Sequence, residues 1–137
     1  MKIVFLDTNI LLDVMLHREE FLPDAVRLWA DCEEGRIRGV ISAITLNNMH
    51  FIMRKRVGSI KALDYVRHAL NVFAVEPLDD TILRLAVDMP CKDFEDAIQT
   101  FSAVHAKAQC IVTRNPSHFS HHYLPIITPR EYWDIHH

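Results

Sequence analysis

The chain has 137 residues, half of them hydrophobic, with few glycines and prolines and a formal net charge of -3 at pH 7. A chain of this length forms one domain with a real core, and its composition excludes a disordered or low-complexity protein. The slight negative charge excludes a strongly basic nucleic-acid coat, so any contact with nucleic acid must be local. We expect a single domain over residues 1–135, and the final pair, His136 and His137, is typical of a remnant of cloning.

Short apolar runs alternate with longer segments of helical periodicity along the chain. Strands are predicted at residues 2–6, 39–42, 72–75, 110–112 and 126–127. Helices are predicted at residues 10–15, 23–34, 45–57 and 59–70, then from Asp79 or Asp80 to 86, and after Asp93 to 104. Thr45 is expected to be the N-cap of the helix that follows it. Strands that alternate with helices indicate an α/β sandwich on a parallel sheet.

The cysteines and the apolar segments bear on the location of the protein. Cys32, Cys91 and Cys110 are widely spaced and match no zinc or redox motif, so they are expected to be reduced and mostly buried. Asp7 and Asp13 interrupt the apolar start, which argues against a secretory signal. No apolar segment is long enough to cross a bilayer. The sequence therefore predicts a cytoplasmic protein with no membrane partner.

Polar residues lie at the end of three of the predicted strands or directly after it. They are Asp7, Ser42, and the run Thr113, Arg114 and Asn115. Because the carboxyl ends of parallel strands meet at one edge of a sheet, we expect these residues to lie along the same edge. An active site would be built there.

Two further acids, Asp93 and Asp96, begin a predicted helix far downstream. They are three residues apart, so both carboxylates can point the same way, whereas Glu95 is expected to point elsewhere. Carboxylates that converge from distant segments suit Mg²⁺ or Mn²⁺, which need few protein ligands because they keep much of their hydration. Asp7, Asp93 and Asp96 are therefore candidate ligands of a divalent metal.

At these residues the chain resembles the PIN domain family, the metal-dependent nuclease fold used by the toxin half of VapC-like toxin–antitoxin pairs. The segments that carry the resemblance are residues 5–13, 42–45, 92–99 and 113–115. Together they span nearly the whole chain in the expected order. The resemblance implies a three-layer α/β/α sandwich with a central parallel sheet, and hydrolysis of RNA phosphodiester bonds.

The resemblance also implies roles for individual residues. Asp7 and Asp96 would bind Mg²⁺ or Mn²⁺, with Asp93 as a third acid at the rim, and Thr8 and Asn9 would orient Asp7 or a water. The metal would activate a water for in-line attack on the phosphate, without a covalent enzyme intermediate. The partners implied are an RNA substrate, a small antitoxin protein and a second copy of the chain.

The sequence differs from the common pattern of that family at three positions. Many PIN nucleases have a glutamate where this chain has Asn48 and a late aspartate where it has Asn115, and His118 replaces a residue that is often acidic. An amide can touch a metal or hold a water, but it adds no negative charge. The chain resembles a subgroup with asparagines at these places, in which Asn115 joins the catalytic set and Asn48 and Thr113 support it.

Two other functions stay open. The first is a PIN-like module that binds RNA or a protein without catalysis, for which Asn48, Asn115 and His118 would be the marks. The second is a metal-dependent phosphohydrolase with an aspartate nucleophile. That chemistry usually needs a second aspartate two residues after the first, where this chain has Asn9.

Each candidate site residue also has a purely structural interpretation. Asp7 can cap the first helix. Asp93 and Asp96 fit an N-cap and its partner three residues later. Asn115, which precedes a proline, is a good N-cap, and Asn48 can serve the start of the helix that contains it.

One concentrated basic run is present in the sequence. It comprises Arg54, Lys55 and Arg56, with Lys61 and Arg67 on the next predicted helix. Such a run can grip an RNA backbone or can simply be a solvated face. Arg114 is a further candidate for contact with RNA because it lies beside the predicted site.

Overall fold

Five strands form one sheet in the order β3-β2-β1-β4-β5, and every neighbouring pair is parallel. The computed structural model describes residues 2–90 and 93–136, so the predictions for Cys91, Lys92 and His137 lie outside it. The strands are β1 (Ile3–Leu6), β2 (Arg38–Ser42), β3 (Ala74–Glu76), β4 (Cys110–Val112) and β5 (Ile126–Ile127). The predicted parallel sheet is confirmed.

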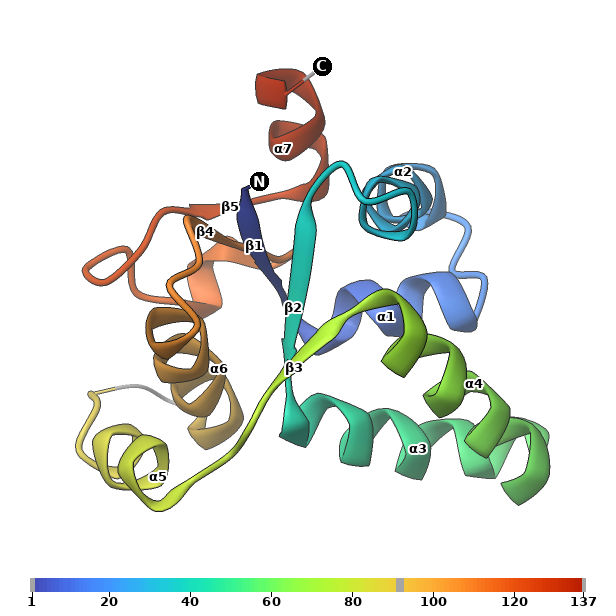
Figure 1. Cartoon of the computed structure of the whole chain (residues 1–137), viewed down its shortest axis with the longest axis horizontal. Coiled ribbons are helices and arrows are strands. Elements are labelled where there is room, and N and C mark those ends of the chain that lie inside the picture. The colour runs from blue at the N-terminus through green and yellow to red at the C-terminus, as the bar shows by residue number, and fades with distance from the viewer. Residues whose placement is uncertain (1, 91–92, 137) are drawn as a thin grey trace.

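Helices connect the strands and cover both faces of the sheet. They are α1 (Thr8–Met15), α2 (Leu22–Glu33), α3 (Ala43–Val57), α4 (Ser59–Val72), α5 (Asp80–Val87), α6 (Phe94–His105) and α7 (Pro129–His136), with a 3₁₀ turn, η1 (Pro116–His118). Figure 1 shows α5 and α6 on one side of the sheet and α1 to α4 on the other. This is the predicted three-layer α/β/α sandwich.

Alternation along the strands explains the two cores. Val4 and Leu6 of β1 pack with α1, α2, α3, α4 and α7, whereas Phe5, between them, packs on the opposite side with Ala103 of α6. Because successive side chains of a strand point to opposite faces, a buried strand needs apolar residues at every position. A smaller cluster joins α5 to α6 through residues such as Ile82 and Ile98.

The strand order places a topological switch point beside β1. From β1 the chain moves outward through β2 to β3, and it then returns to place β4 on the other side of β1. In sheets of this kind a crevice opens beyond the carboxyl ends of the strands where the order reverses. Asp7 and Thr113, which directly follow β1 and β4, flank that point.

Two predicted boundaries were wrong. The N-cap of α3 is Ser42, whose Oγ accepts a hydrogen bond from the backbone N–H of Ile44 at 3.2 Å, and Thr45 lies buried inside the helix. Strand β3 begins at Ala74 rather than at residue 72, because α4 continues through Val72.

Helix α7 was not predicted from the sequence, although a local signal for it exists. Thr128 and Glu131 form a reciprocal capping box: the Glu131 N–H donates to Thr128 Oγ1 at 3.0 Å, and the Thr128 N–H donates to Glu131 Oε1 at 3.1 Å. The helix buries Tyr132, whose hydroxyl donates to Asp31 Oδ2 at 3.2 Å. It thereby packs against α2.

The cysteines behave as predicted within the described part of the chain. Cys32 and Cys110 are free and buried. Burial raises the pKa of the Cys32 thiol to about 12 and that of the Cys110 thiol to about 11, so both are protonated at neutral pH. Within residues 2–90 and 93–136, no helix combines the length and the apolar character needed to span a membrane.

We expect Gly39→Ala to destabilise the fold. A Cβ at this position of β2 would lie 2.5 Å from Cys32 Sγ and 2.9 Å from Phe73 Cδ1. Overpacking of this kind costs about 1–3 kcal/mol, which equilibrium unfolding in denaturant can measure. Arg38→Ala, at the exposed neighbouring position, should change the free energy of unfolding by less than about 0.5 kcal/mol. An unchanged value for Gly39→Ala would show that its neighbours move aside at no cost.

Candidate active site

The buried carboxylate of Asp7 lies at the centre of the site. Its Oδ1 accepts a hydrogen bond from Gln99 Nε2 at 3.0 Å, and its Oδ2 accepts one from Thr113 Oγ1 at 2.8 Å. Although Asp7 occupies the N-cap position of α1, its side chain makes no capping hydrogen bond. Burial raises the pKa of this carboxyl, and the bonds from Thr113 and Gln99 oppose the rise. The carboxylate thus joins α6 and the segment after β4 at the switch point.

Gln99 ties three elements together and was not singled out from the sequence. Besides donating to Asp7, its Oε1 accepts from the backbone N–H of Thr8 at 3.1 Å. The Thr8 hydroxyl in turn lies 2.8 Å from the hydroxyl of Thr45 on α3. No local sequence signal marks Gln99, because it lies off the apolar stripe of α6 and is fully buried only through the packing of that helix.

The prediction that Glu95 points away from the site was wrong. Asn48 Nδ2 on α3 donates a hydrogen bond to Glu95 Oε1, and Gln99 Nε2 lies 3.5 Å from Glu95 Oε2. Residues four apart on a helix lie one above the other, so Glu95 shares the face of Gln99. Asn48 therefore links α3 to α6. It does not cap the start of α3, as its structural interpretation supposed.

Asp93 and Asp96 have different roles in the structure. Asp93 is exposed and is the N-cap of α6, where its Oδ1 accepts from the N–H groups of Glu95 at 2.8 Å and Asp96 at 3.2 Å. The structural interpretation of Asp93 is confirmed. Burial, together with the negative charges of Asp93, Asp7 and Glu95, raises the pKa of the Asp96 carboxyl to about 7. The carboxylates of Asp7, Asp93, Glu95 and Asp96 therefore lie close enough to interact electrostatically.

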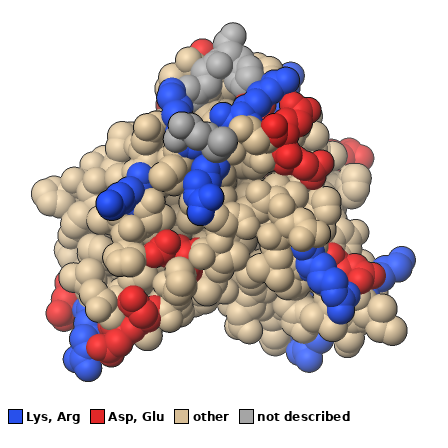
Figure 2. Space-filling view, viewed as in Figure 1, with Lys and Arg blue, Asp and Glu red and all other residues tan. Residues whose placement is uncertain are grey.

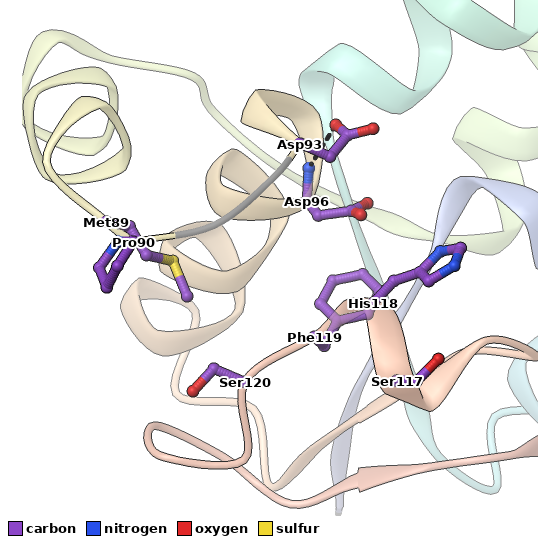
Figure 3. A pocket seen from close by; sticks show the side chains of 8 residues that line it. All are labelled: Met89, Pro90, Asp93, Asp96, Ser117, His118, Phe119 and Ser120. Atoms are coloured by element: carbon purple, nitrogen blue, oxygen red, sulfur yellow. Dashed lines mark hydrogen bonds between the residues drawn. The ribbon is translucent and has the colours of Figure 1, made fainter.

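A cavity of about 700 Å³ adjoins these acids. It is lined by Met89, Pro90, Asp93, Asp96, Ser117, His118, Phe119 and Ser120. Figure 3 shows Asp93 and Asp96 at the start of α6 on one wall, with the segment around η1 opposite them and Met89 and Pro90 at the far side. The cavity is therefore part apolar and part acidic, and it lies directly beside the carboxylates.

The segment after β4 supports Asp7. Thr113 Oγ1 accepts from the backbone N–H of Asn115 at 3.1 Å while it donates to Asp7. Asn115 stands at the N-cap position of η1, but its side chain makes no capping hydrogen bond, so the predicted capping role was wrong. Asn9, predicted to help orient Asp7, lies partly exposed in the first turn of α1.

Arg114 has a buried partner on α1. Its Nε lies 3.0 Å from Asp13 Oδ2, and its guanidinium stands 4.3 Å from the centroid of the Phe21 ring. Arg18 also pairs with Asp13, at 3.1 Å. Because only 22% of the Arg114 side chain is exposed, this arginine serves first to fix the chain after β4 against α1.

The basic run lies in the last turn of α3, as predicted. Lys55 Nζ is 4.1 Å and the Arg54 guanidinium 5.5 Å from the centroid of the half-exposed Phe51 ring, and Arg56 follows them. Seven residues separate Lys55 from Asn48, or about 10 Å along the helix axis. Figure 2 shows basic and acidic side chains intermingled over the α3 and α4 side of the molecule and again over α5, so charges of one sign do not cover either side.

The acids fit a divalent cation by their chemistry. Oxygen donors suit Mg²⁺ and Mn²⁺, and a cation would relieve the repulsion that, together with burial as the larger cause, raises the pKa of Asp96. Within the described residues, however, no three His, Cys, Asp or Glu side chains are grouped closely enough to hold a metal ion. Hydrogen bonds to Gln99, Thr113 and Asn48 hold Asp7 and Glu95 instead.

Comparison with known protein families finds a match. The family model described as PIN domain matches residues 3–117. A search of curated proteins finds no match. Among solved structures, VapBC2 from Rickettsia felis bound to a DNA fragment from its promoter has a TM-score of 0.68 at 15% identity, covering 92% of this chain and 98% of that chain.

Two further structures are similar in fold. A toxin–antitoxin complex from Klebsiella pneumoniae has a TM-score of 0.67 at 22% identity, covering 92% of this chain and 97% of the other. VapC20 from Mycobacterium tuberculosis, a toxin that cleaves the sarcin-ricin loop, has a TM-score of 0.61 at 21% identity, covering 79% and 86%. At these identities the likeness concerns the fold.

Asp96→Asn should flatten the pH dependence of stability. Because the pKa of Asp96 is raised from 3.8 to about 7 in the folded protein, the stability it contributes is fully present below pH 3.8 and is lost as the pH rises to about 7. The melting temperature of the wild type, measured in EDTA, should therefore fall more across this range than that of the variant. Parallel curves would contradict the raised pKa, and Glu20→Gln, at an exposed site, should match the wild type.

Gln99→Ala should destabilise the protein by about 1–3 kcal/mol, because the Asp7 carboxylate and the Thr8 N–H each lose a buried partner. Urea unfolding followed by circular dichroism measures this loss. Gln109→Ala, at an exposed glutamine, is the matched control and should have a small effect. Equal stabilities of the two variants would show that the Gln99 bonds contribute nothing net.

Proposed function

Because this chain belongs to the PIN domain family, we propose that it is a metal-dependent ribonuclease that hydrolyses RNA phosphodiester bonds as the toxin of a toxin–antitoxin pair. The observation that carries the proposal is the buried Asp7 carboxylate at the switch point, with Asp96 close enough to sense its charge. A buried acid supported by neutral donors beside a cavity is a common arrangement at catalytic sites.

PIN nucleases generally use divalent metal ions. In this chain we assign Asp7 and Asp96 as the residues that would hold Mg²⁺ or Mn²⁺, with Asp93 at the rim. When bound, the cation would lower the pKa of a water and neutralise charge on the scissile phosphate.

The remaining residues would position Asp7 and the start of α1 and would set the net charge of the site. Gln99 and Thr113 fix the Asp7 carboxylate, and the Thr8 hydroxyl, held by Thr45, keeps the start of α1 in place. Asn115, beside Thr113, would orient a water or a phosphate oxygen through its amide. An amide there adds no negative charge, so the site repels a polyanionic substrate less than an aspartate would.

RNA would enter through the cavity beside Asp96. Its Ser117 and Ser120 hydroxyls and the His118 ring offer hydrogen bonds to a nucleotide, and Met89 offers an apolar surface to a base. The basic run of Arg54, Lys55 and Arg56 would attract the backbone further along the strand, and the exposed edge of Arg114 would contribute.

The proposed partners rest on analogy with the related structures. The Klebsiella pneumoniae structure is a toxin–antitoxin complex, and we propose that this chain likewise binds a small antitoxin. A homodimer and a cytoplasmic location are proposed from the resemblance alone. Light scattering of the purified protein measures the oligomeric state.

A second candidate function is a PIN-like module that binds RNA without cutting it. The observation in its favour is that the described residues hold no ready-made group of three metal-ligating side chains. The amides of Asn48 and Asn115 stand where further acids would strengthen a metal site.

The test is cleavage of a fluorescent single-stranded RNA in Mn²⁺, Mg²⁺ or EDTA. We expect cutting in the presence of either metal and none in EDTA, and Asp7→Asn and Asp96→Asn should each reduce the rate by more than about 100-fold because each removes a ligand charge. Glu20→Gln should cut like the wild type. Binding of the RNA without cutting in any metal, by protein that melts cooperatively, would favour the binding module.

A further inference from the structure

Glu95 lies where helices α3 and α6 meet above Asp7. One of its oxygens accepts from Asn48 Nδ2, and the other lies 3.5 Å from Gln99 Nε2. The same Gln99 nitrogen donates to Asp7 Oδ1 at 3.0 Å. The carboxylates of Glu95 and Asp7 are therefore separated by a single amide NH₂ group.

The carboxylate of Glu95 lies close to that of Asp7, since both lie near Gln99 Nε2. The Glu95 side chain is half-buried, and after burial the charge of Asp7 is the largest cause of its raised pKa. Asp93, in contrast, is exposed, and one of its oxygens already caps the N–H groups of α6. Of these two acids near Asp96, only Glu95 shares an amide with Asp7.

Asn48 is chemically matched to this arrangement. Its amide can donate to a carboxylate, whereas an acid at the same place would set two negative charges against each other across α3 and α6. The helix α3 thus supplies the donor and α6 supplies the charge. A donor from another helix also restricts the rotamers of Glu95.

We propose that Glu95, rather than Asp93, is the third carboxylate that would face the divalent metal with Asp7 and Asp96, and that Asn48 is the positioning residue that holds it there. The inference rests on the proposed metal-dependent function and deepens it. On this proposal, Glu95 of α6 supplies the negative charge that α3 lacks because it has an asparagine, Asn48.

The experiment is titration of the purified full chain with Mn²⁺, followed by calorimetry and by electron paramagnetic resonance of free Mn²⁺, with no RNA present. We expect Glu95→Gln to weaken Mn²⁺ binding by about 10- to 100-fold, and Asp93→Asn to weaken it by less than about 3-fold, since asparagine also caps helices. Glu20→Gln is the charge-matched control at an exposed site. Melting temperatures establish that each variant is folded.

An exchange variant tests the role of Asn48. Asn48→Glu combined with Glu95→Gln moves the carboxylate to α3 and the amide to α6, and it should recover Mn²⁺ affinity to within about 3-fold of the wild type. Failure of the exchange to recover affinity over Glu95→Gln would overturn the pairing of Asn48 with Glu95.

Two outcomes separate this inference from the proposed function. Wild-type affinity in Glu95→Gln, together with a loss in Asp96→Asn, would overturn the role of Glu95 and leave the metal-dependent function standing. A larger loss in Asp93→Asn than in Glu95→Gln would overturn the inference in favour of Asp93. Absence of Mn²⁺ binding by the wild type at millimolar concentration would overturn the proposed function and the inference with it.

Discussion

A carboxylate as buried as that of Asp7 requires partners for both oxygens, and this requirement organises the site. Gln99 Nε2 and Thr113 Oγ1 meet it from α6 and from the segment after β4. Since a buried polar group without a partner costs several kcal/mol, β1, β4 and α6 must approach one another at the point where the strand order reverses. The hydrogen bonds of Asp7 thus fix these three elements at the switch point. Asp96 and Glu95 of α6 add further negative charge there.

Asp13 and Asp7 are both buried and close in sequence, but within the described residues only the charge of Asp13 is paired with cationic side chains. Asp13 is paired with the cationic side chains of Arg18 and Arg114, so its negative charge is neutralised within the fold. Asp7 has only neutral donors, so its charge remains available to a cation. The two sites are adjacent through the chain, because Arg114 directly follows Thr113. The ion pair of the first therefore anchors the strand end that supports the second.

The sequence predicts the layers, the parallel sheet and the position of Asp7 at the carboxyl end of β1. Apolar periodicity and the position of a residue after a strand are local signals. The sequence also places Thr113 correctly at the edge of the sheet. It does not predict that Glu95 turns inward or that Gln99 bridges two chain segments, because both depend on how α6 packs against α3 and β1. Helix α7 was not predicted for another reason. It is short and polar, so its apolar periodicity is too weak to indicate a helix even though a capping box precedes it.

The hydrogen bonds of the site join residues that lie far apart along the chain. Thr8 meets Thr45 across 37 positions and Gln99 across 91, and Asp7 meets Thr113 across 106. Contacts of such long range carry a greater loop-closure entropy than local ones, and chains rich in them fold more slowly. During synthesis, the carboxylate of Asp7 gains its second donor only after β4 has left the ribosome and paired with β1. An unfinished chain therefore lacks the assembled site, and the chemistry becomes available only with nearly the whole domain.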